Sequence, residues 1–218
     1  MFNEELTAGI RECGAVAVLT VERAEDAVPL ARALLAGGVD AMELTLRTPA
    51  AVEALAAVVH EVPEMVAGVG TILTPGQVAE VKKAGAAFGV APGTNPRVVE
   101  AAREAGLPFA PGVATPSDVE RAVELGCRVL KFFPAEPIGG LPYLRSMAAP
   151  YAHLGLCFMP LGGVNAGNMV AYLKDPLILA VGGSWIARKE KIRQHDWAAI
   201  TETARQAIDL AGDARESG

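Results

Sequence analysis

Two charged residues lie within segments that are otherwise mostly apolar. Lys131 stands in the middle of residues 128–134, and Glu43 stands in the middle of residues 41–46. An ammonium group is costly to bury, and burial favours its neutral form. A neutral amine can attack a ketone and form a Schiff base, and a nearby carboxylate can move the protons that such a reaction requires. The two residues therefore predict covalent chemistry on a carbonyl compound.

The alternation of side chains along a strand gives each charged residue its neighbours. Lys131 lies on the same side of its strand as Val129 and Phe133. Glu43 lies on the same side of its strand as Thr45 and Arg47. Three polar residues on one inward side are hard to explain by packing. Structural alternatives stay open, because Lys131 can extend from a strand end into water. Glu43 can also form a structural ion pair with Arg47 or Lys131.

Two Gly-Gly pairs indicate where an anion can bind. Gly162 and Gly163 follow one apolar segment, and Gly182 and Gly183 precede Ser184. Unobstructed backbone N–H groups near helix starts bind phosphate, although a single pair is also typical of a tight turn. Two pairs at the ends of consecutive strands favour a phosphate site.

Thr71 and Pro92 stand at the ends of two further apolar segments. The Thr71 hydroxyl can donate to a substrate carboxylate, and Pro92 can form a rigid apolar wall. Each residue taken singly is also common in turns.

Metal chemistry has little support in the sequence. The histidines His60, His153 and His195 show no spacing that suggests a metal site, and we expect them at the surface. The three cysteines form no CxxC pair, which is typical of reduced thiols in a cytosolic protein. We therefore expect neither a metal nor a cofactor.

Composition argues against two classes of partner. The 218 residues are 51% hydrophobic and carry a formal net charge of −6, with no basic stripe to bind nucleic acid. No uncharged apolar run is long enough to span a membrane, and the first 13 residues lack the apolar region of a signal peptide. We expect a cytoplasmic protein with a small-molecule substrate.

The order of segments predicts the fold. Short apolar runs alternate with helical patterns, and eight strands are expected at 15–20, 41–46, 65–71, 88–93, 108–114, 128–134, 156–163 and 177–184. This repeat predicts a parallel eight-stranded sheet closed into a single (β/α)8 TIM barrel over residues 1–218. A doubly wound open sheet is the alternative, but it wants a glycine-rich fingerprint after the first strand, and none is present.

Helix ends carry a repeated signal. A capping residue precedes proline at Thr48, Thr74, Asn95 and Thr115, and Gln77 completes a capping box with Thr74. Glycines that end helices are expected at Gly37, Gly85, Gly106 and Gly126. Residues 196–212 are expected to form the last helix, and residues 213–218 a frayed tail.

Together these motifs resemble one known family. "GGVDAMELTLRT", "GVGT", "APG", "KFFPAE", "GGV" and "VGGSW" occur in this order, as in the 2-keto-3-deoxy-6-phosphogluconate (KDPG) and 4-hydroxy-2-oxoglutarate aldolases. The similarity extends from about residue 15 to about residue 210. It implies a metal-free class I aldolase of the Entner–Doudoroff pathway, built as a (β/α)8 barrel and usually a homotrimer. The substrate would be a keto-acid phosphate cleaved to pyruvate and glyceraldehyde 3-phosphate.

The resemblance also implies roles for single residues. Lys131 matches the Schiff-base lysine and Glu43 the general acid and base. Arg47 and Thr71 match the residues that hold the pyruvate carboxylate, and Pro92 matches a wall of the pocket. The phosphate-binding positions are matched by Gly162, Gly163 and Ser184.

One position departs from the pattern. Leu161 stands where family members often have threonine, so a hydroxyl donor is replaced by an apolar side chain. The preferred substrate therefore stays open among KDPG, its galactonate epimer and 4-hydroxy-2-oxoglutarate. More distant alternatives are a phosphosugar isomerase, which needs no Schiff base, and a non-catalytic phosphate-binding barrel.

Overall fold

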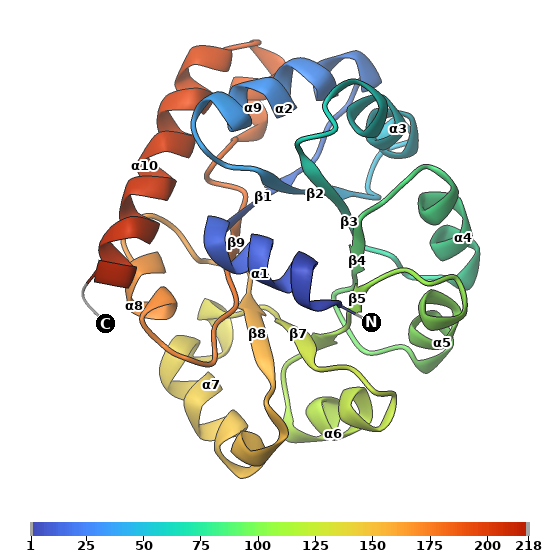
Figure 1. Ribbon diagram of the computed structural model, residues 1–218, viewed down its shortest axis with the longest axis vertical. Coiled ribbons are helices and arrows are strands. Elements are labelled where there is room, and N and C mark those ends of the chain that lie inside the picture. The colour runs from blue at the N-terminus through green and yellow to red at the C-terminus, as the bar shows by residue number, and fades with distance from the viewer. Residues whose placement is uncertain (1, 217–218) are drawn as a thin grey trace.

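The computed structural model describes residues 2–216, and the side chains of residues 2–215. Short strands occupy the centre and helices surround them (Figure 1). The strands are β1 (Ala15–Leu19), β2 (Ala41–Thr45), β3 (Val66–Gly70), β4 (Phe88–Val90), β5 (Phe109–Ala110), β6 (Gly112–Val113), β7 (Val129–Phe132), β8 (Cys157–Pro160) and β9 (Val181–Gly183).

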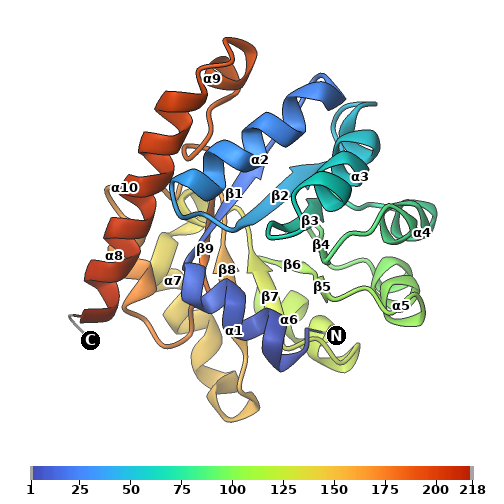
Figure 2. The same ribbon diagram turned by 45° about the horizontal axis from the view of Figure 1, so that its top comes forward.

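Helix α1 precedes the first strand, and the other helices follow the strands around the outside (Figure 2). They are α1 (Glu4–Cys13), α2 (Ala27–Ala36), α3 (Ala51–Glu61), α4 (Pro75–Lys83), α5 (Pro96–Glu104), α6 (Pro116–Glu124), α7 (Gly140–Ala148), α8 (Met169–Leu173), α9 (Lys189–Arg193) and α10 (Trp197–Glu216). Short 3-10 helices cover Ala24–Asp26, Glu136–Ile138 and Ala149–Leu154.

All strand pairs are parallel, which confirms the predicted α/β class. One sheet has six strands in the order β5-β4-β3-β2-β1-β9, and the other has three in the order β6-β7-β8. The predicted strand 108–114 is divided at Pro111, which has no N–H to give to a ladder. The predicted strand 177–184 begins only at Val181, and residue 178 makes an isolated bridge to Phe158. One continuous sheet of eight strands is therefore not what the described residues form.

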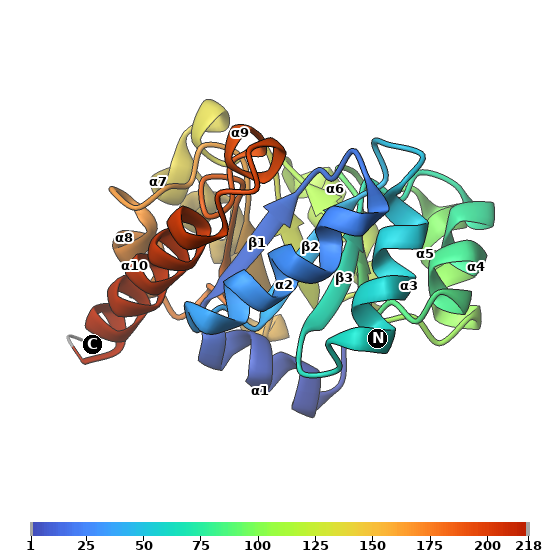
Figure 3. The same ribbon diagram turned by 90° about the horizontal axis from the view of Figure 1, so that it is seen from above.

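The two ends of the strands differ. Helix α1 lies across the end at which the strands begin, and the strand arrows point away from it (Figure 3). Parallel strands deliver their carboxyl ends to a common rim, and the loops that follow them gather there. The side chains at this opposite rim include those that the sequence selected.

Three of the four predicted N-caps are confirmed. The Thr74 side chain accepts from the Gln77 N–H and completes the predicted capping box, Thr115 caps α6, and Asn95 caps α5. The prediction for Thr48 was wrong, because α3 begins at Ala51 and the Thr48 hydroxyl donates to the Val21 carbonyl at 2.6 Å.

The predicted helix ends hold with two corrections. Gly85, Gly106 and Gly126 follow their helices with positive φ, whereas Gly37 stays right-handed and the next residue, Gly38, takes the positive φ. Helix α10 continues to Glu216, so the frayed tail was wrong for residues 213–216. Residues 217–218 of that prediction lie outside the described part of the chain.

The core is built mostly from alanine, valine and leucine of the strands and of the inward faces of the helices. Within the described part of the chain, few polar or charged residues are buried: Asp26, Glu43, Thr45, Lys131 and Asp175. Polar groups are buried at a cost unless they are paired. Three of these five come from the two segments that the sequence singled out.

Candidate active site

Lys131 and Glu43 meet in the interior. Lys131 Nζ lies 3.0 Å from Glu43 Oε1 and 3.3 Å from Oε2, and the two residues are 5% and 1% exposed. Lys131 therefore does not extend into water. Its Nζ also lies 5.6 Å from the centre of the Phe133 ring, a distance at which an ammonium group is attracted to an aromatic face.

Register explains how two strands from different sheets bring these groups together. Glu43 on β2 is paired with Gly68 on β3, and Lys131 on β7 is paired with Gly112 on β6 and with Met159 on β8. Gly70 lies two residues after Gly68 on β3 and therefore on the same side of that strand. A Cβ atom there would overlap the Glu43 carboxylate, so the carboxylate occupies space that only glycine leaves.

Gly70 is a residue of the site that sequence reasoning missed. The signal was present, because a glycine inside a buried strand often marks the close approach of another group. Nothing in the sequence says that the approaching group is the Glu43 carboxylate.

Thr45 has a structural explanation. Its hydroxyl donates to the Leu19 carbonyl at 2.9 Å and lies 2.8 Å from the Thr20 hydroxyl. The second inward polar position of the predicted strand is thus occupied by a residue that joins β2 to the end of β1.

Arg47 and Thr71 lie together at the rim. Arg47 Nε lies 3.4 Å from Thr71 Oγ1, whereas Glu43 pairs with Lys131, so the ion pair between Glu43 and Arg47 is not formed. Thr71 has φ 62, which is rare for a β-branched residue and is typical of functional sites. The arrangement brings a cation and a hydroxyl to the ends of β2 and β3.

Pro92 borders the strand next to Lys131. It is exposed in the loop after β4, and a Cβ atom on Gly112 would overlap its backbone. Gly112 is in register with Lys131. Pro92 also lines a hollow of about 270 Å³ together with Ile72 and Leu73. Sequence reasoning also missed Gly112, which lets Pro92 approach.

The two Gly-Gly pairs lie side by side. Gly162 and Gly163 form a turn after β8 with φ 93 and 89, and both carbonyls accept hydrogen bonds from this chain. Gly182 and Gly183 are buried inside β9, and the exposed Ser184 follows them. The second pair is therefore part of a strand, and Ser184 is the first residue of the loop.

Leu161 fills the space between the pairs. It forms a parallel bridge with Gly182, and a Cβ on Gly182 would lie 2.5 Å from the Leu161 side chain. Leu161 is 4% exposed. The apolar side chain therefore packs against β9 and takes the room that the missing side chain of Gly182 provides.

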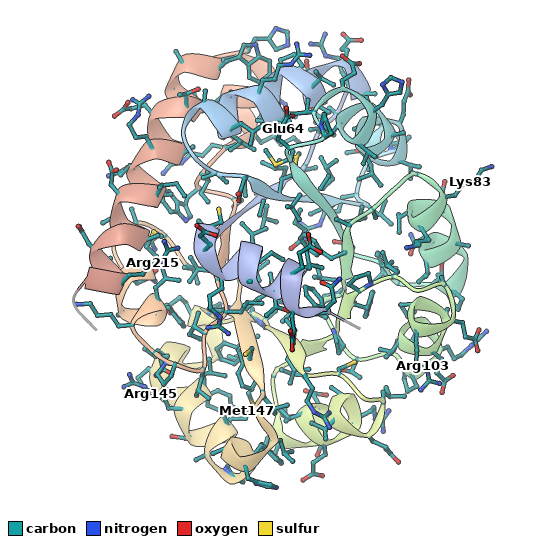
Figure 4. The ribbon with its side chains drawn as sticks, viewed as in Figure 1. Glu64, Lys83, Arg103, Arg145, Met147 and Arg215 are labelled. Carbon is teal, nitrogen blue, oxygen red and sulfur yellow. The ribbon has the colours of Figure 1, made fainter. Side chains whose placement is uncertain are left out.

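A second hollow, of about 740 Å³, has none of these residues in its lining. It is lined by Arg11, Leu179 and Arg215 among others, and Arg215 is on α10 beside α1 (Figure 4). This hollow contains neither the buried amine nor the carboxylate, which meet elsewhere in the interior.

The three histidines lie at the surface of the molecule. His60, His153 and His195 are exposed, as predicted. Residues 2–216 contain no group of three or more His, Cys, Asp or Glu side chains that could hold a metal ion. In the same part of the chain no helix is both long and apolar enough to cross a membrane. Cys13, Cys127 and Cys157 are free thiols.

Residues 6–203 match the family model described as KDPG and KHG aldolase. The chain belongs to this family. The resemblance seen in the sequence motifs is therefore confirmed, and the match covers the strands that carry Glu43 and Lys131.

Curated relatives share about two fifths of their residues with this chain. It is 43% identical over 197 residues to the 2-dehydro-3-deoxy-phosphogluconate aldolase of Treponema pallidum, which covers 90% of this chain and 93% of the relative. It is 41% identical over 196 residues to the KHG/KDPG aldolase of Escherichia coli K12, with 90% and 91% covered.

Solved structures of the family have the same fold. The KDPG aldolase of Legionella pneumophila, with pyruvate captured at low pH as a covalent carbinolamine intermediate, gives a TM-score of 0.87 at 38% identity and covers 92% of this chain and 97% of its own. The aldolase of Zymomonas mobilis with 3-phosphoglycerate gives 0.86 at 39% identity, with 94% and 95% covered.

Proposed function

We propose that this chain is a class I aldolase, a lyase that cleaves KDPG reversibly to pyruvate and glyceraldehyde 3-phosphate. The observation that carries the proposal is the buried contact of Lys131 Nζ with Glu43 Oε1 at 3.0 Å. Schiff-base chemistry needs an amine that is shielded from water and a group that moves protons to and from it. Relatives at 43% and 41% identity carry the names of aldolases for this class of substrate.

The first half of the reaction joins Lys131 to the substrate. Lys131 Nζ gives one proton to Glu43 and, as a neutral amine, forms a bond to C2 of the keto acid. A second proton moves from the nitrogen to the C2 oxygen, which becomes a hydroxyl. Glu43 then returns the first proton to that hydroxyl, which leaves as water and gives the protonated imine. The separation of 3.0–3.3 Å between Nζ and the two carboxylate oxygens is a hydrogen-bond distance.

The second half breaks the carbon–carbon bond. A base removes the proton of the C4 hydroxyl, the C3–C4 bond breaks, and its electron pair moves into the imine to form an enamine. The aldehyde departs as glyceraldehyde 3-phosphate. Protonation of C3 and addition of water then release pyruvate and restore the amine. Glu43 is the group that this geometry offers for each proton transfer.

The substrate-binding roles are also proposals. Arg47 and Thr71 would hold the carboxylate, because a cation and a hydroxyl stand together beyond Glu43. Pro92 would form an apolar wall. The phosphate would meet the backbone of Gly162 and Gly163 and the hydroxyl of Ser184, while Gly182 and Gly183 would contribute by leaving the strand below without side chains.

We propose that residues 1–218 form one domain and that its two sheets complete a single closed (β/α)8 barrel. Counting β5 and β6 as one strand interrupted at Pro111 gives eight strands. Support for closure comes from the parallel bridges Phe158–Ile178 and Leu161–Gly182 between the edges, and from the Gly112 N–H that donates to the Gly93 carbonyl at 3.3 Å.

The assembly and location rest on the family resemblance and on composition. We propose a cytoplasmic homotrimer without nucleic-acid or membrane partners. The free thiols and the net charge of −6 agree with this proposal. A mass of one chain, 22.6 kDa, in light scattering of the purified protein would contradict the trimer.

A second candidate substrate is 4-hydroxy-2-oxoglutarate. It is favoured by Leu161, whose apolar side chain lies beside the proposed phosphate site, and by the dual name of the Escherichia coli relative. The ratio of kcat/KM for the two substrates decides between them. The galactonate epimer differs from KDPG in configuration at one carbon, and the same assay ranks it. The phosphosugar isomerase and the non-catalytic barrel give no role to a buried amine.

The proposed mechanism predicts a covalent adduct. Incubation of the folded protein with pyruvate and borohydride should leave one reduced pyruvyl group, and peptide mapping by mass spectrometry should place it on Lys131. Lys83 is a matched control, because it is an exposed lysine on α4 (Figure 4). Lys131→Ala should abolish the adduct and essentially all cleavage, and Lys83→Ala should change neither.

Two outcomes would contradict the mechanism. Absence of an adduct in a folded sample would exclude Schiff-base chemistry, and equal labelling of Lys83 would show that the label reports exposure. A Lys131 that takes no label and whose replacement unfolds the protein would support a purely structural ion pair with Glu43.

A further inference from the structure

The loop that follows the lysine strand is joined to the glycine turn. We call residues 133–139 the lysine-strand loop and residues 161–164 the glycine loop. The Ala135 N–H donates to the Leu161 carbonyl at 2.8 Å, and the Glu136 N–H donates to the Gly162 carbonyl at 2.9 Å. These bonds continue the β7–β8 ladder past its last paired residues and join the two loops to each other.

The side chain of Glu136 covers the glycine loop. A Cβ atom on Gly163 would lie 2.5 Å from Glu136 Cβ and 2.8 Å from Cγ. The Glu136 side chain therefore lies against the backbone at Gly163, which is one of the proposed phosphate-binding positions. Its carboxylate is not used by the mechanism proposed above.

A buried tyrosine fixes that carboxylate. Tyr172 is 2% exposed on α8, and its hydroxyl donates to Glu136 Oε1 at 2.5 Å. Burial, and then the hydrogen bond to the carboxylate, raise the pKa of Tyr172 far above its usual range, so the hydroxyl stays a donor. A hydrogen bond from a neutral donor to a charged acceptor is stronger than one between neutral groups.

The helix that carries Tyr172 is itself anchored. Arg145 on α7 pairs with the buried Asp175 just after α8, and Arg145 lies at the outer edge of α7 (Figure 4). The Asp175 N–H donates to the Tyr172 carbonyl at 2.9 Å. The tyrosine hydroxyl is thus presented from a fixed frame to a loop at the rim of the strands.

We propose that Glu136 and Tyr172 are positioning residues that set how tightly this enzyme holds the phosphorylated aldehyde half of its substrate. Through Glu136 they hold the glycine loop at a fixed place relative to the strand of Lys131. The hydrogen bond between them is separate from the Lys131–Glu43 pair, so we expect formation of the Schiff base not to depend on them. The inference rests on the proposed aldolase function and assigns a task that the function alone does not imply.

The direct test is Tyr172→Phe, which removes one hydroxyl and keeps the ring. The aldol addition of pyruvate to glyceraldehyde 3-phosphate is compared with its addition to unphosphorylated glyceraldehyde. We expect KM for the phosphorylated aldehyde to rise about tenfold, the scale of one lost charge-assisted hydrogen bond. We expect kcat to change by less than about threefold, because a contact equal in ground and transition states affects KM alone.

The chain offers a matched control. Tyr151 also donates to a glutamate, Glu120 Oε1 at 3.1 Å, and this bond includes no residue of either loop. Tyr151→Phe should leave the kinetics with both aldehydes unchanged. Trapping of pyruvate on Lys131 by borohydride should be equal in the wild type and in both variants.

A second variant keeps the inference testable if Tyr172→Phe is unstable. Glu136→Gln retains the packing on Gly163 and removes the charge, and it should raise the same KM selectively. The double variant should be no worse than the more severe single one, since one change removes and the other weakens the same hydrogen bond.

The possible results separate the inference from the function it rests on. An equal rise in KM for both aldehydes, or an unchanged KM for glyceraldehyde 3-phosphate, would overturn the positioning role. A wild-type protein that traps no pyruvate would instead refute the aldolase function. A rise in KM for the phosphorylated aldehyde alone, together with normal trapping of pyruvate on Lys131, would support the positioning role and the aldolase function.

Discussion

The central contact depends on residues that carry no reactive group. Glu43 reaches Lys131 because Gly70 has no side chain, and Pro92 approaches the lysine strand because Gly112 has none. A misplacement of about 1 Å at a reacting group costs about 100-fold in rate. The glycines therefore belong to the proposed catalytic geometry as much as the charged residues do.

We predict that Gly70→Ala impairs catalysis as much as removal of the Glu43 carboxylate does. The added methyl group would overlap the carboxylate and displace it from Lys131. We expect kcat for KDPG cleavage to fall at least about 100-fold, within the range that general acid–base catalysis contributes. In Glu43→Gln we expect kcat to fall by a similar factor. Gly76→Ala is the control, because its nearest atom would be 3.9 Å away. Near-native turnover in Gly70→Ala would contradict this geometry.

Helix caps fix where the elements begin, and so which residues form the rim. Thr115 accepts from the Asp118 N–H while the Asp118 carboxylate accepts from the Thr115 N–H at 3.0 Å. This reciprocal pair starts α6 directly after β6, next to the strand of Lys131. Sequence reasoning found the cap at Thr115 but not its partner Asp118, because the familiar box has Glu or Gln at that position.

For this element we predict a loss of stability on Thr115→Ala. The substitution removes an acceptor for the first-turn N–H groups, which typically costs about 1 kcal/mol. Urea denaturation should show a lower midpoint with an unchanged slope. Ser117→Ala, an exposed change two residues later in the same helix, should alter the free energy of unfolding by less than about 0.5 kcal/mol. Equal effects of the two changes would refute the cap.

The whole molecule keeps two thiols out of water at places far apart in the fold. Cys13 ends α1 beneath the strands, and Cys127 precedes β7. Burial, assisted by the Asp40 charge, raises the pKa of Cys13 from 9.0 to about 11, and burial raises that of Cys127 to about 11. Both thiols therefore stay protonated in the folded chain at a pH where they ionise in the unfolded chain.

The raised pKa values of the two thiols make the folded chain less stable as the pH rises above 9. Above pH 9 the unfolded chain loses thiol protons that the folded chain keeps, so stability present below pH 9 is lost as the pH rises toward 11. We expect each thiol to contribute on the order of 2 kcal/mol to this loss by pH 11. The free energy of unfolding, measured by urea denaturation, should fall more steeply over that pH range for the wild type than for a variant with both Cys13→Ala and Cys127→Ala. Parallel profiles would contradict the prediction.

The sequence by itself determined which residues to examine. A charge inside an apolar strand is visible without a structure, and so are the capping residues before proline and the glycines after helices, because each of these signals is local. The α/β class and the order of its segments follow from the same local patterns, as does the family. Two local predictions needed correction: Thr48 does not cap a helix, and the glycine with positive φ after α2 is Gly38 rather than Gly37.

Only the tertiary structure decided which groups meet. Glu43 and Lys131 are 88 residues apart, and no local signal chooses Lys131 over Arg47 as the partner of Glu43. The same is true of Leu161 against Gly182 and of Tyr172 with Glu136. Such contacts depend on strand register and on how the helices pack against the strands, and a shift of one residue reverses the side that every side chain faces.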